Sequence, residues 1–241
     1  SALCRSTPEL PAPWWTSFCK GLGQLARREN VLIAGGDTVV TQGMMTLTVT
    51  AWGSCEGDTT LLCRSGARPG DLLMLCPGLG VGASSEGLRR WMTHEVSAQW
   101  SVEVPNIDEV IMSHLRPEPP LWAGPWALRH GASAGMDCSD GLIQDVDRLA
   151  RASGVGFDVD LGGLPLDPRC GAMGLIERAA GGEDYGLLVC VPAQRRNDFE
   201  ARGFLYLGAA RQTIGVRWFE GVERLEVTSE GFIHFERSDR D

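Results

Sequence analysis

The amino-acid sequence predicts an α/β (α+β) protein of two domains, and three observations lead to that prediction. The chain has 241 residues, which is enough to bury a sizeable core in one or two domains. Short apolar runs of strand length alternate with longer segments whose apolar residues recur at helical spacing. A link rich in turn residues, at 64–71, separates a shorter part from a longer one. We place the first domain at residues 1–60 and the second, an α/β domain, at residues 61–241.

The first domain is predicted to hold one helix and two strands. Three prolines among residues 1–13 predict an extended opening segment. A helix follows from Pro13, with an apolar face that we expect to lie in a core. That face is formed by Trp15, Phe18, Cys19, Leu22, Leu25 and Ala26. Residues 31–34 are expected to form a short buried strand, and residues 46–52, where threonines alternate with apolar residues, a half-exposed one.

The second domain is predicted to alternate strands with helices. The predicted strands occupy residues 72–76, 132–136, 155–161, 186–191, 214–219 and 222–228. The last two flank a Glu220-Gly221 turn and predict a hairpin. The predicted helices occupy residues 104–115, 121–130, 142–150, 172–180 and 193–202. Trp122 and Trp126 are four residues apart, so we expect them to share one helix face in the core.

A glycine-rich segment at 77–87 follows the first predicted strand of the second domain. Its G-x-G spacings, at 78/80 and 80/82, lack the rest of the dinucleotide-binding pattern. A glycine loop over a phosphate is the alternative that stays open there. Arg64 and Arg68 are either phosphate-binding residues or ordinary solvated arginines.

The composition excludes several classes of site. The formal net charge of −9 argues against nucleic acid as a partner, because phosphate backbones need surfaces rich in Lys and Arg. Lys20 is the only lysine, and its helical setting suits neither a P-loop nor a Schiff base. The eight cysteines include no C-x-x-C pair and form no zinc pattern with the four histidines. We expect Cys63, Cys76 and Cys190 to be buried thiols in a reducing compartment.

The location of the protein follows from what the sequence lacks. The opening residues do not read as a signal peptide, and no apolar run approaches the length needed to span a membrane. We therefore expect a cytoplasmic protein without a membrane partner.

Glycines and acids gather at three places beside predicted strands. The clusters are G-G-D-T at 35–38, D-C-S-D-G at 137–141 and G-G-E-D at 181–184. Glycine lets a backbone approach a ligand closely, and carboxylates hold a cation whose other ligands are phosphate oxygens. Each cluster alone is also an ordinary turn with charged surface residues. Together they predict one pocket suited to Mg²⁺ and polyphosphate.

The middle cluster lies between a predicted strand and a predicted helix, and two interpretations of it stay open. Ser139 or Asp140 would cap the helix by accepting hydrogen bonds from its first N–H groups, worth about 1 kcal/mol. One cap is enough for one helix, so the second carboxylate would be explained by metal binding. Asp137, Ser139 and Asp140 are therefore candidates for both roles.

Seven motifs occur along the chain in a fixed order. They are G-G-D-T at 35–38, R-S-G-A at 64–67, R-P-x-P at 116–119, D-C-S-D-G-L at 137–142, A-S-G-V-G at 152–156, G-G-E-D-Y at 181–185 and G-F-I-H-F at 231–235. With these motifs the chain resembles the thiamine-monophosphate kinase family along essentially its whole length. The family belongs to a wider group of aminoimidazole-ribonucleotide-synthetase-like ATP-using enzymes. The resemblance implies the fold of that group, two domains of mixed sheets packed with helices.

The resemblance implies ATP as a co-substrate and assigns residues to it. Gly36 and Asp37 would contact ATP. Arg64 would contact the nucleotide phosphates, and Ser139 would bind ATP as well.

The resemblance also implies magnesium and a phosphorylated substrate. Asp37, Asp137 and Asp140 would hold Mg²⁺ ions. Glu183 would bind thiamine monophosphate, and Phe232 would pack against its rings.

The implied reaction is the phosphorylation of thiamine monophosphate to thiamine diphosphate. A phosphate oxygen of thiamine monophosphate would attack the γ-phosphorus of ATP. That oxygen is already ionised near neutral pH, so no side chain is needed as a general base. Charge neutralisation by metal ions and positioning would carry the catalysis.

The chain departs from the family pattern in two respects. The family has an upstream segment with a G-D-D motif, a further metal-binding acid, a substrate-binding histidine and an S-D-x-A-A-M-G stretch, and its dimer pairs strands through that segment. We therefore expect an incomplete N-terminal domain, a homodimer only at full length, and weak or absent activity from this chain alone. Pro120 stands where the family usually has arginine. The alternatives are another ATP-using enzyme of the wider group and a nucleotide-binding fragment without catalysis.

Overall fold

The computed structural model describes residues 2–6, 11–40, 45–55, 61–78, 80–93, 109–165 and 173–227. Contacts between residues divide the chain into two compact units, with the described residues up to 55 in unit 1 and those from 61 onward in unit 2. No helix in the described part of the chain is long and apolar enough to cross a membrane. That the two units are the two domains of an enzyme stays a prediction.

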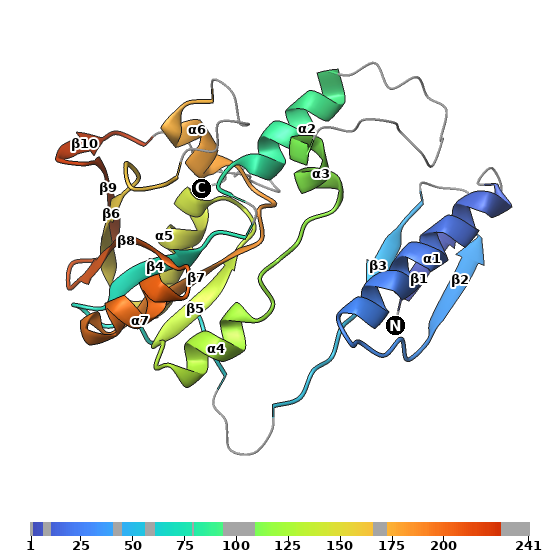
Figure 1. Ribbon diagram of the computed structural model, residues 1–241, viewed down its shortest axis with the longest axis horizontal. Coiled ribbons are helices and arrows are strands. Elements are labelled where there is room, and N and C mark those ends of the chain that lie inside the picture. The colour runs from blue at the N-terminus through green and yellow to red at the C-terminus, as the bar shows by residue number, and fades with distance from the viewer. Residues whose placement is uncertain are drawn as a thin grey trace, which may run out of the picture. The chain divides into compact units, whose positions relative to one another are not determined.

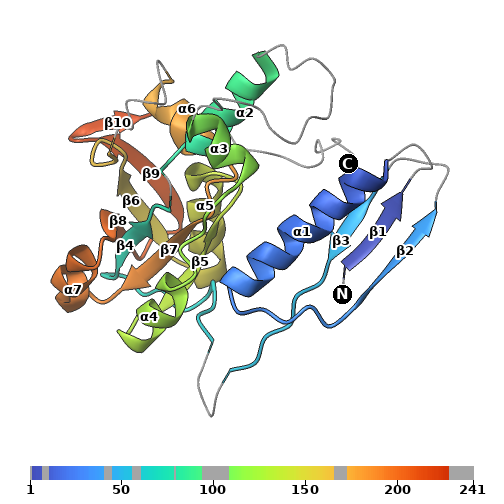
Figure 2. The same ribbon diagram turned by 45° about the vertical axis from the view of Figure 1, so that its right-hand side comes forward.

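Unit 1 consists of a three-stranded sheet and one long helix (Figure 1). Its elements are β1 (Ala2–Ser6), α1 (Ala12–Arg28), β2 (Gly36–Val40) and β3 (Leu47–Val49). Strand β1 lies in the middle of the sheet, parallel to β2 and antiparallel to β3. Helix α1 runs beside the three strands in Figures 1 and 2.

Two predictions about burial in unit 1 are wrong. None of residues 11–40 and 45–55 is buried, so the apolar face of α1 does not lie in a core. Residues 31–34 form no strand, and Leu32 is 87% exposed. The strand begins at Gly36 instead. The reason is the small size of unit 1, because one helix and three strands of three to five residues are too few to cover these side chains.

Unit 2 is built on a seven-stranded mixed sheet in the order β10-β9-β6-β8-β4-β7-β5. The strands are β4 (Leu72–Cys76), β5 (Ala134–Cys138), β6 (Gly156–Asp160), β7 (Gly186–Val191), β8 (Leu205–Arg211), β9 (Gly215–Glu220) and β10 (Glu223–Leu225). The β6 and β9 pair is parallel, and the other pairs in this sheet are antiparallel.

Helices cover both faces of this sheet. They are α2 (Ala83–Thr93), α3 (Glu109–Leu115), α4 (Ala123–Arg129), α5 (Leu142–Ser153), α6 (Leu175–Ala180) and α7 (Arg196–Ala201), the last preceded by the 3₁₀ turn η2 (Ala193–Arg195). One core lies under α5 and α6 and takes in Leu73 and Leu75 of β4. The other lies under α4 and α7 and takes in Met74 of the same strand. Strand β4 is therefore buried on both faces, which explains its unbroken apolar run.

Most predicted elements of unit 2 are confirmed. The predicted strands correspond to β4, β5, β6, β7, β9 and β10, and β9 and β10 form the predicted hairpin. The predicted helices correspond to α3, α4, α5, α6 and α7 with η2. Residues 104–108 and 172, within two of those predictions, lie outside the described residues.

Two side-chain predictions in unit 2 need correction. Trp126 packs against the second core, but Trp122 is 42% exposed and carries the guanidinium of Arg202 over its ring, 4.5 Å from the centroid. Cys76 and Cys190 are buried as predicted, whereas Cys63 is exposed. Cys63 precedes β4 in an irregular segment that contributes its carbonyl to the N–H of Gly135 and leaves its side chain outside.

Candidate functional site

The junction between β5 and α5 carries three of the predicted site residues. Asp137 is the fourth residue of β5, and its side chain is 55% exposed. Helix α5 starts after Gly141, whose φ of 110° suits glycine, and no side chain caps it. The interpretation that Ser139 or Asp140 caps this helix is therefore wrong. Both residues stay open to other roles.

Asp145, in the first turn of α5, fixes this junction in place. Its Oδ2 accepts hydrogen bonds from the backbone N–H groups of Ser139 and Asp140, both at 2.9 Å. Its Oδ1 accepts one from Arg148 Nη1 at 2.8 Å. The same nitrogen of Arg148 also donates to Asp140. Asp145 is fully buried, and burial raises the pKa of its carboxyl while these hydrogen bonds favour the ionised form.

The second acidic loop, at 181–185, places two neighbouring acids in opposite environments. Asp184 is buried and accepts hydrogen bonds from the N–H groups of Gly82 and Ser84, at 2.6 and 2.9 Å. It therefore caps helix α2, and burial raises its pKa to about 7. The side chain of Glu183 is 55% exposed. The backbone φ is 66° at Glu183 and 52° at Tyr185. This left-handed conformation costs a non-glycine residue about 1 kcal/mol or more.

The cap by Asp184 bears on whether the glycine-rich segment at 77–87 binds a phosphate. The N–H groups of Gly82 and Ser84 point at a carboxylate of the protein itself. These donors are therefore taken, so the start of α2 does not offer them to a phosphate. A glycine loop over a phosphate elsewhere in residues 77–87 stays a prediction. Residues 83–87 of the segment belong to α2 and not to a loop.

The β5–α5 junction and the loop at 181–185 contact each other through their backbones. The N–H of Glu183 donates to the carbonyl of Ser139 at 2.6 Å. A Cβ atom on Gly182 would lie 2.8 Å from that same carbonyl oxygen, and one on Gly141 would lie 2.5 Å from the carbonyl oxygen of Ala180. Only glycine fits at both positions, so the glycines of the two motifs allow this close approach.

This contact brings carboxylates from distant parts of the sequence together. Burial raises the pKa of the Tyr185 phenol, and the negative charges of Glu183, Asp137 and Asp140 raise it further. Burial also raises the pKa of the Cys138 thiol, with Asp137 and Asp140 among the acids that add to the effect. Three predicted site acids of unit 2 therefore act on one phenol.

A guanidinium and an imidazole flank these acids. Arg64 Nη2 lies 3.8 Å from Asp137 Oδ1, and both side chains are more than half exposed. His114 Nδ1 lies 3.1 Å from Glu183 Oε2 and 3.1 Å from the hydroxyl of Ser84. Arg64, predicted to contact phosphates, thus lies beside a predicted metal ligand.

Two further predicted site residues belong to unit 1. Gly36 and Asp37 open strand β2 of unit 1, paired with Ala2 and Leu3, and Asp37 accepts a hydrogen bond from the N–H of Thr38. The convergence of Asp37 with Asp137 and Asp140 stays a prediction, because Asp37 belongs to the other unit. Phe232 lies outside the described residues.

The chemistry of the donors in unit 2 fits magnesium. Among the described residues, no three His, Cys, Asp or Glu side chains form a metal-ligand group. Mg²⁺ does not require such a group, since it is usually bound by one or two carboxylates, several waters and substrate phosphates. Asp137 and Asp140 would supply two hard oxygen ligands of that kind, and Arg64, a side chain that suits phosphate, lies 3.8 Å from Asp137.

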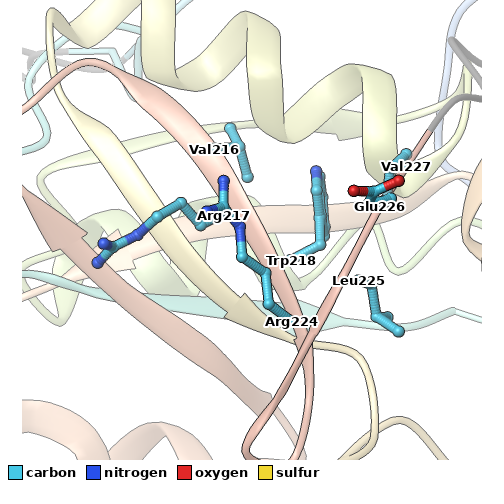
Figure 3. Close-up of a pocket in the computed structure, with 7 residues that line it drawn as sticks. All are labelled: Val216, Arg217, Trp218, Arg224, Leu225, Glu226 and Val227. Atoms are coloured by element: carbon cyan, nitrogen blue, oxygen red, sulfur yellow. The ribbon is translucent and has the colours of Figure 1, made fainter.

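A pocket of about 600 Å³ lies in another part of unit 2, at the β9–β10 hairpin (Figure 3). Its lining consists of Val216, Arg217, Trp218, Arg224, Leu225, Glu226 and Val227. None of these residues belongs to either acidic loop.

The sequence analysis missed three residues of the site: Asp145, Arg148 and Asp184. A signal for Asp145 existed, because an acid in the first helical turn often reaches back to N–H groups before the helix. Arg148 follows it by three residues and so lies on the same helix face. Asp184 gave no such signal, since its hydrogen-bond partner Gly82 lies 102 residues earlier.

Comparisons with known proteins agree with this architecture. Residues 68–202 match the family model described as AIR synthase related protein, C-terminal domain. The thiamine-monophosphate kinase of Caulobacter vibrioides is 34% identical over 184 residues, which are 73% of this chain and 49% of that kinase. The thiamine-monophosphate kinase of Salmonella typhimurium is 33% identical over 202 residues, 80% of this chain and 58% of that kinase. The chain thus spans about half of the length of such relatives.

Solved structures share the fold. A structure of AaThiL complexed with AMPPCP and TMP has a TM-score of 0.76 and 24% identity, over 97% of this chain and 72% of that one. The Escherichia coli hydrogenase maturation protein HypE has a TM-score of 0.67 and 18% identity, over 94% of this chain and 72% of that one. These likenesses support the fold alone. With the match over residues 68–202 and the similarity to curated kinases, the chain belongs to the AIR synthase related family and is a homologue of thiamine-monophosphate kinases.

Proposed function

We propose that this chain is part of an ATP- and Mg²⁺-dependent enzyme that phosphorylates thiamine monophosphate to thiamine diphosphate. The observation that carries the proposal is the contact between the two segments that hold Asp137, Asp140 and Glu183: the N–H of Glu183 donates to the carbonyl of Ser139 at 2.6 Å, although some forty residues of sequence separate them. The homology to thiamine-monophosphate kinases supports it. A related fold holds AMPPCP, an ATP analogue with a methylene bridge between the β- and γ-phosphates, which supports ATP as the phosphate donor.

The reaction joins two anions, so its barrier is largely electrostatic. A phosphate oxygen of thiamine monophosphate forms a bond to the γ-phosphorus of ATP, the bond from that phosphorus to the bridging oxygen breaks, and ADP leaves with the electron pair. When bound, Mg²⁺ supplies charge neutralisation for the phosphate oxygens. The attacking oxygen is already anionic near neutral pH, so the site needs no general base.

The side chains divide the work by charge. Asp137 and Asp140 would hold Mg²⁺, and Arg64, 3.8 Å from Asp137, would neutralise phosphate oxygens at the same place. Glu183, half exposed and on the adjoining loop, would attract the thiazolium cation of the substrate. The contact between the two segments would therefore hold the proposed metal-binding and substrate-binding acids at a fixed spacing.

The test is formation of thiamine diphosphate and ADP from ATP and thiamine monophosphate, by this chain and by the full-length protein, followed by chromatography. We expect Mg²⁺-dependent product from the full-length protein. D137N and D140N should each lower kcat/KM about a hundredfold or more, because each removes a charge that acts on the transition state. D147N, on the solvent side of α5 with Arg151 as its partner, is the matched control and should retain activity. Absence of product from the full-length protein with Mg²⁺ present would exclude this function.

A second candidate is another ATP-using reaction within the same fold. The likeness to a hydrogenase maturation protein supports this candidate, because a protein of another name shares the fold with only 18% sequence identity. A panel of phosphate acceptors and other nucleophiles, each with ATP and Mg²⁺, separates the two candidates. ATP binding without turnover by any acceptor would favour a nucleotide-binding role for this chain.

Three further points belong to the same proposal: residues 1–60 are the C-terminal part of the N-terminal ATP-binding domain, the full-length protein is a homodimer, and it acts in the cytoplasm. Size-exclusion chromatography with light scattering on the full-length protein tests the homodimer.

A further inference from the structure

Arg148 bonds to two acids whose surroundings differ sharply. Its Nη1 donates to Asp145 Oδ1 at 2.8 Å and also to Asp140 Oδ2. The side chain of Asp145 is 0% exposed, that of Asp140 is 22% exposed, and that of Arg148 is 36% exposed. Arg148 thus reaches from the buried interior of the junction to the acid that faces the proposed metal site.

Asp145 is the fixed partner of this arginine. Its other oxygen accepts the N–H groups of Ser139 and Asp140, so its carboxylate cannot turn without breaking the loop that carries Asp140. The carboxylate of Asp140 accepts a hydrogen bond from Arg148, whereas its backbone N–H is held by Asp145, so breaking the bond to Arg148 lets the carboxylate turn about the side-chain bonds without disturbing the backbone.

A guanidinium and a divalent cation compete for the same carboxylate. Both carry positive charge, and two cations on one carboxylate group would lie a few ångströms apart and repel each other. Without a metal, however, Asp137, Asp140 and Glu183 bring three negative charges near Tyr185. A protein cation on Asp140 relieves this repulsion.

We propose that Arg148 is an exchangeable counter-ion of the site: it neutralises Asp140 while Mg²⁺ is absent and yields that carboxylate to Mg²⁺ while Asp145 retains the arginine. The inference rests on the proposed function, which assigns Mg²⁺ to Asp140. Arg148 is a positioning residue in this scheme, since it acts through Asp140 and contacts neither ATP nor substrate.

The test measures Mg²⁺ binding and not turnover. The 241-residue chain is freed of metal with EDTA and titrated with MgCl₂ by isothermal calorimetry, and its thermal midpoint is recorded with and without MgCl₂ at matched ionic strength. R148M should bind Mg²⁺ about fivefold more tightly or better than the parent chain, because the competing cation is gone. The rise in its thermal midpoint on adding Mg²⁺ should also be larger.

R151M is the matched control for this experiment. Arg151 lies on the same helix and also pairs with a carboxylate, Asp147, at 2.8 Å, but that pair is on the solvent side. R151M should bind Mg²⁺ like the parent chain. If R148M does not fold, R148Q, which keeps a hydrogen-bond donor for Asp145 without a charge, replaces it with the same expectation.

The outcomes separate this inference from the function on which it rests. If the parent chain binds Mg²⁺ with Asp140 as a ligand (D140N weakens binding) and both R148M and R148Q bind it no more tightly, the counter-ion role is overturned and the proposed function stands. If the parent chain does not bind Mg²⁺, or D140N leaves binding unchanged, the metal assignment is overturned and the counter-ion role with it. Tighter binding by a charge-free Arg148 variant alone, and not by R151M, supports the inference.

Discussion

The β5–α5 junction, at 137–145, and the loop at 181–185 each carry one buried acid and one exposed acid, which differ in what they contact. At the junction Asp145 is buried against two backbone N–H groups and Arg148, while Asp137 is half exposed. In the second loop Asp184 is buried against two N–H groups of α2, while Glu183 is half exposed. In each segment one acid therefore holds backbone N–H groups in place, and another acid keeps an exposed carboxylate that a ligand can reach.

The two buried acids differ in their charge compensation. Asp145 has an arginine beside it, whereas Asp184 is stabilised by backbone donors of a helix start without an arginine among its partners. Burial accordingly raises the pKa of Asp184 to about 7. A carboxylate in a glycine-rich motif is therefore not necessarily a ligand, because buried backbone N–H groups also need an acceptor.

The largest effect is expected from D145A. The substitution removes the acceptor of the N–H groups of Ser139 and Asp140 and one of the acceptors of Arg148, so it should lower the free energy of unfolding by about 3 kcal/mol or more. Urea denaturation followed by tryptophan fluorescence measures it. D147N removes an exposed acid of the same helix and should change the free energy by less than about 0.5 kcal/mol. Equal effects of D145A and D147N would contradict the structural role of Asp145.

A smaller and pH-dependent effect is expected from D184N. An amide can accept from only one of the two N–H groups of Gly82 and Ser84, so the loss should be about 1–3 kcal/mol. The pKa of Asp184 is higher in the folded chain, at about 7, than in the unfolded chain, so the folded state binds the proton more tightly between about pH 4 and 7. The parent chain therefore loses stability relative to D184N as the pH rises through that window.

Urea denaturation of both proteins at pH 5 and pH 8 tests this dependence. The stability difference between the parent chain and D184N should be largest at pH 5 and should narrow at pH 8. D158N is the pH-independent control: Arg217 holds the pKa of Asp158 below its usual value, so the benefit of that pair is lost only below about pH 4, and the gap between the parent chain and D158N should be the same at pH 5 and pH 8. A gap that widens from pH 5 to pH 8 for D184N would refute the assignment.

The smallest effect on stability is expected from R64Q. Arg64 and Asp137 are both more than half exposed and 3.8 Å apart, so their ion pair contributes less than about 0.5 kcal/mol to folding. If Arg64 contacts phosphate as proposed, the same substitution should raise the KM for ATP about tenfold. R151Q, which removes an exposed arginine of α5 that pairs with Asp147, is the matched control and should leave the KM unchanged. A KM for ATP that is the same in R64Q and the parent enzyme would remove Arg64 from the nucleotide site.

The sequence predicted those parts of the fold whose signals are local. Helix α5 and strands β4 and β7 were predicted from the spacing of their apolar residues, and the structure has them where expected. Strand β8 was missed because Gly208, Ala209 and Ala210 interrupt its apolar pattern. Gly208 is required there, since a side chain would overlap the carbonyl of Asp158 on the neighbouring strand. That requirement exists only once the two strands are paired.

Distant contacts account for the other misses. Helix α2 begins in a glycine- and serine-rich segment of low helix propensity, and its cap comes from Asp184, a hundred residues later. The site residues of unit 2 were found by their motifs, but the roles of Asp145 and Asp184 depend on burial, which the sequence does not display. The apolar residues 31–34 were expected to be buried because apolar runs usually are, and only the structure shows that nothing covers them.

The strand order of the large sheet has a consequence for how the protein is made. Its first three strands, β4, β5 and β6, do not pair with one another, and every ladder in the described sheet includes β7, β8 or β9. A ribosome therefore has to synthesise the chain beyond residue 186 before the first ladder can close. The nascent polypeptide would carry its apolar β4 segment unpaired for more than a hundred codons, so assembly of this sheet is a late event of translation and exposes the chain to chaperones and aggregation until then.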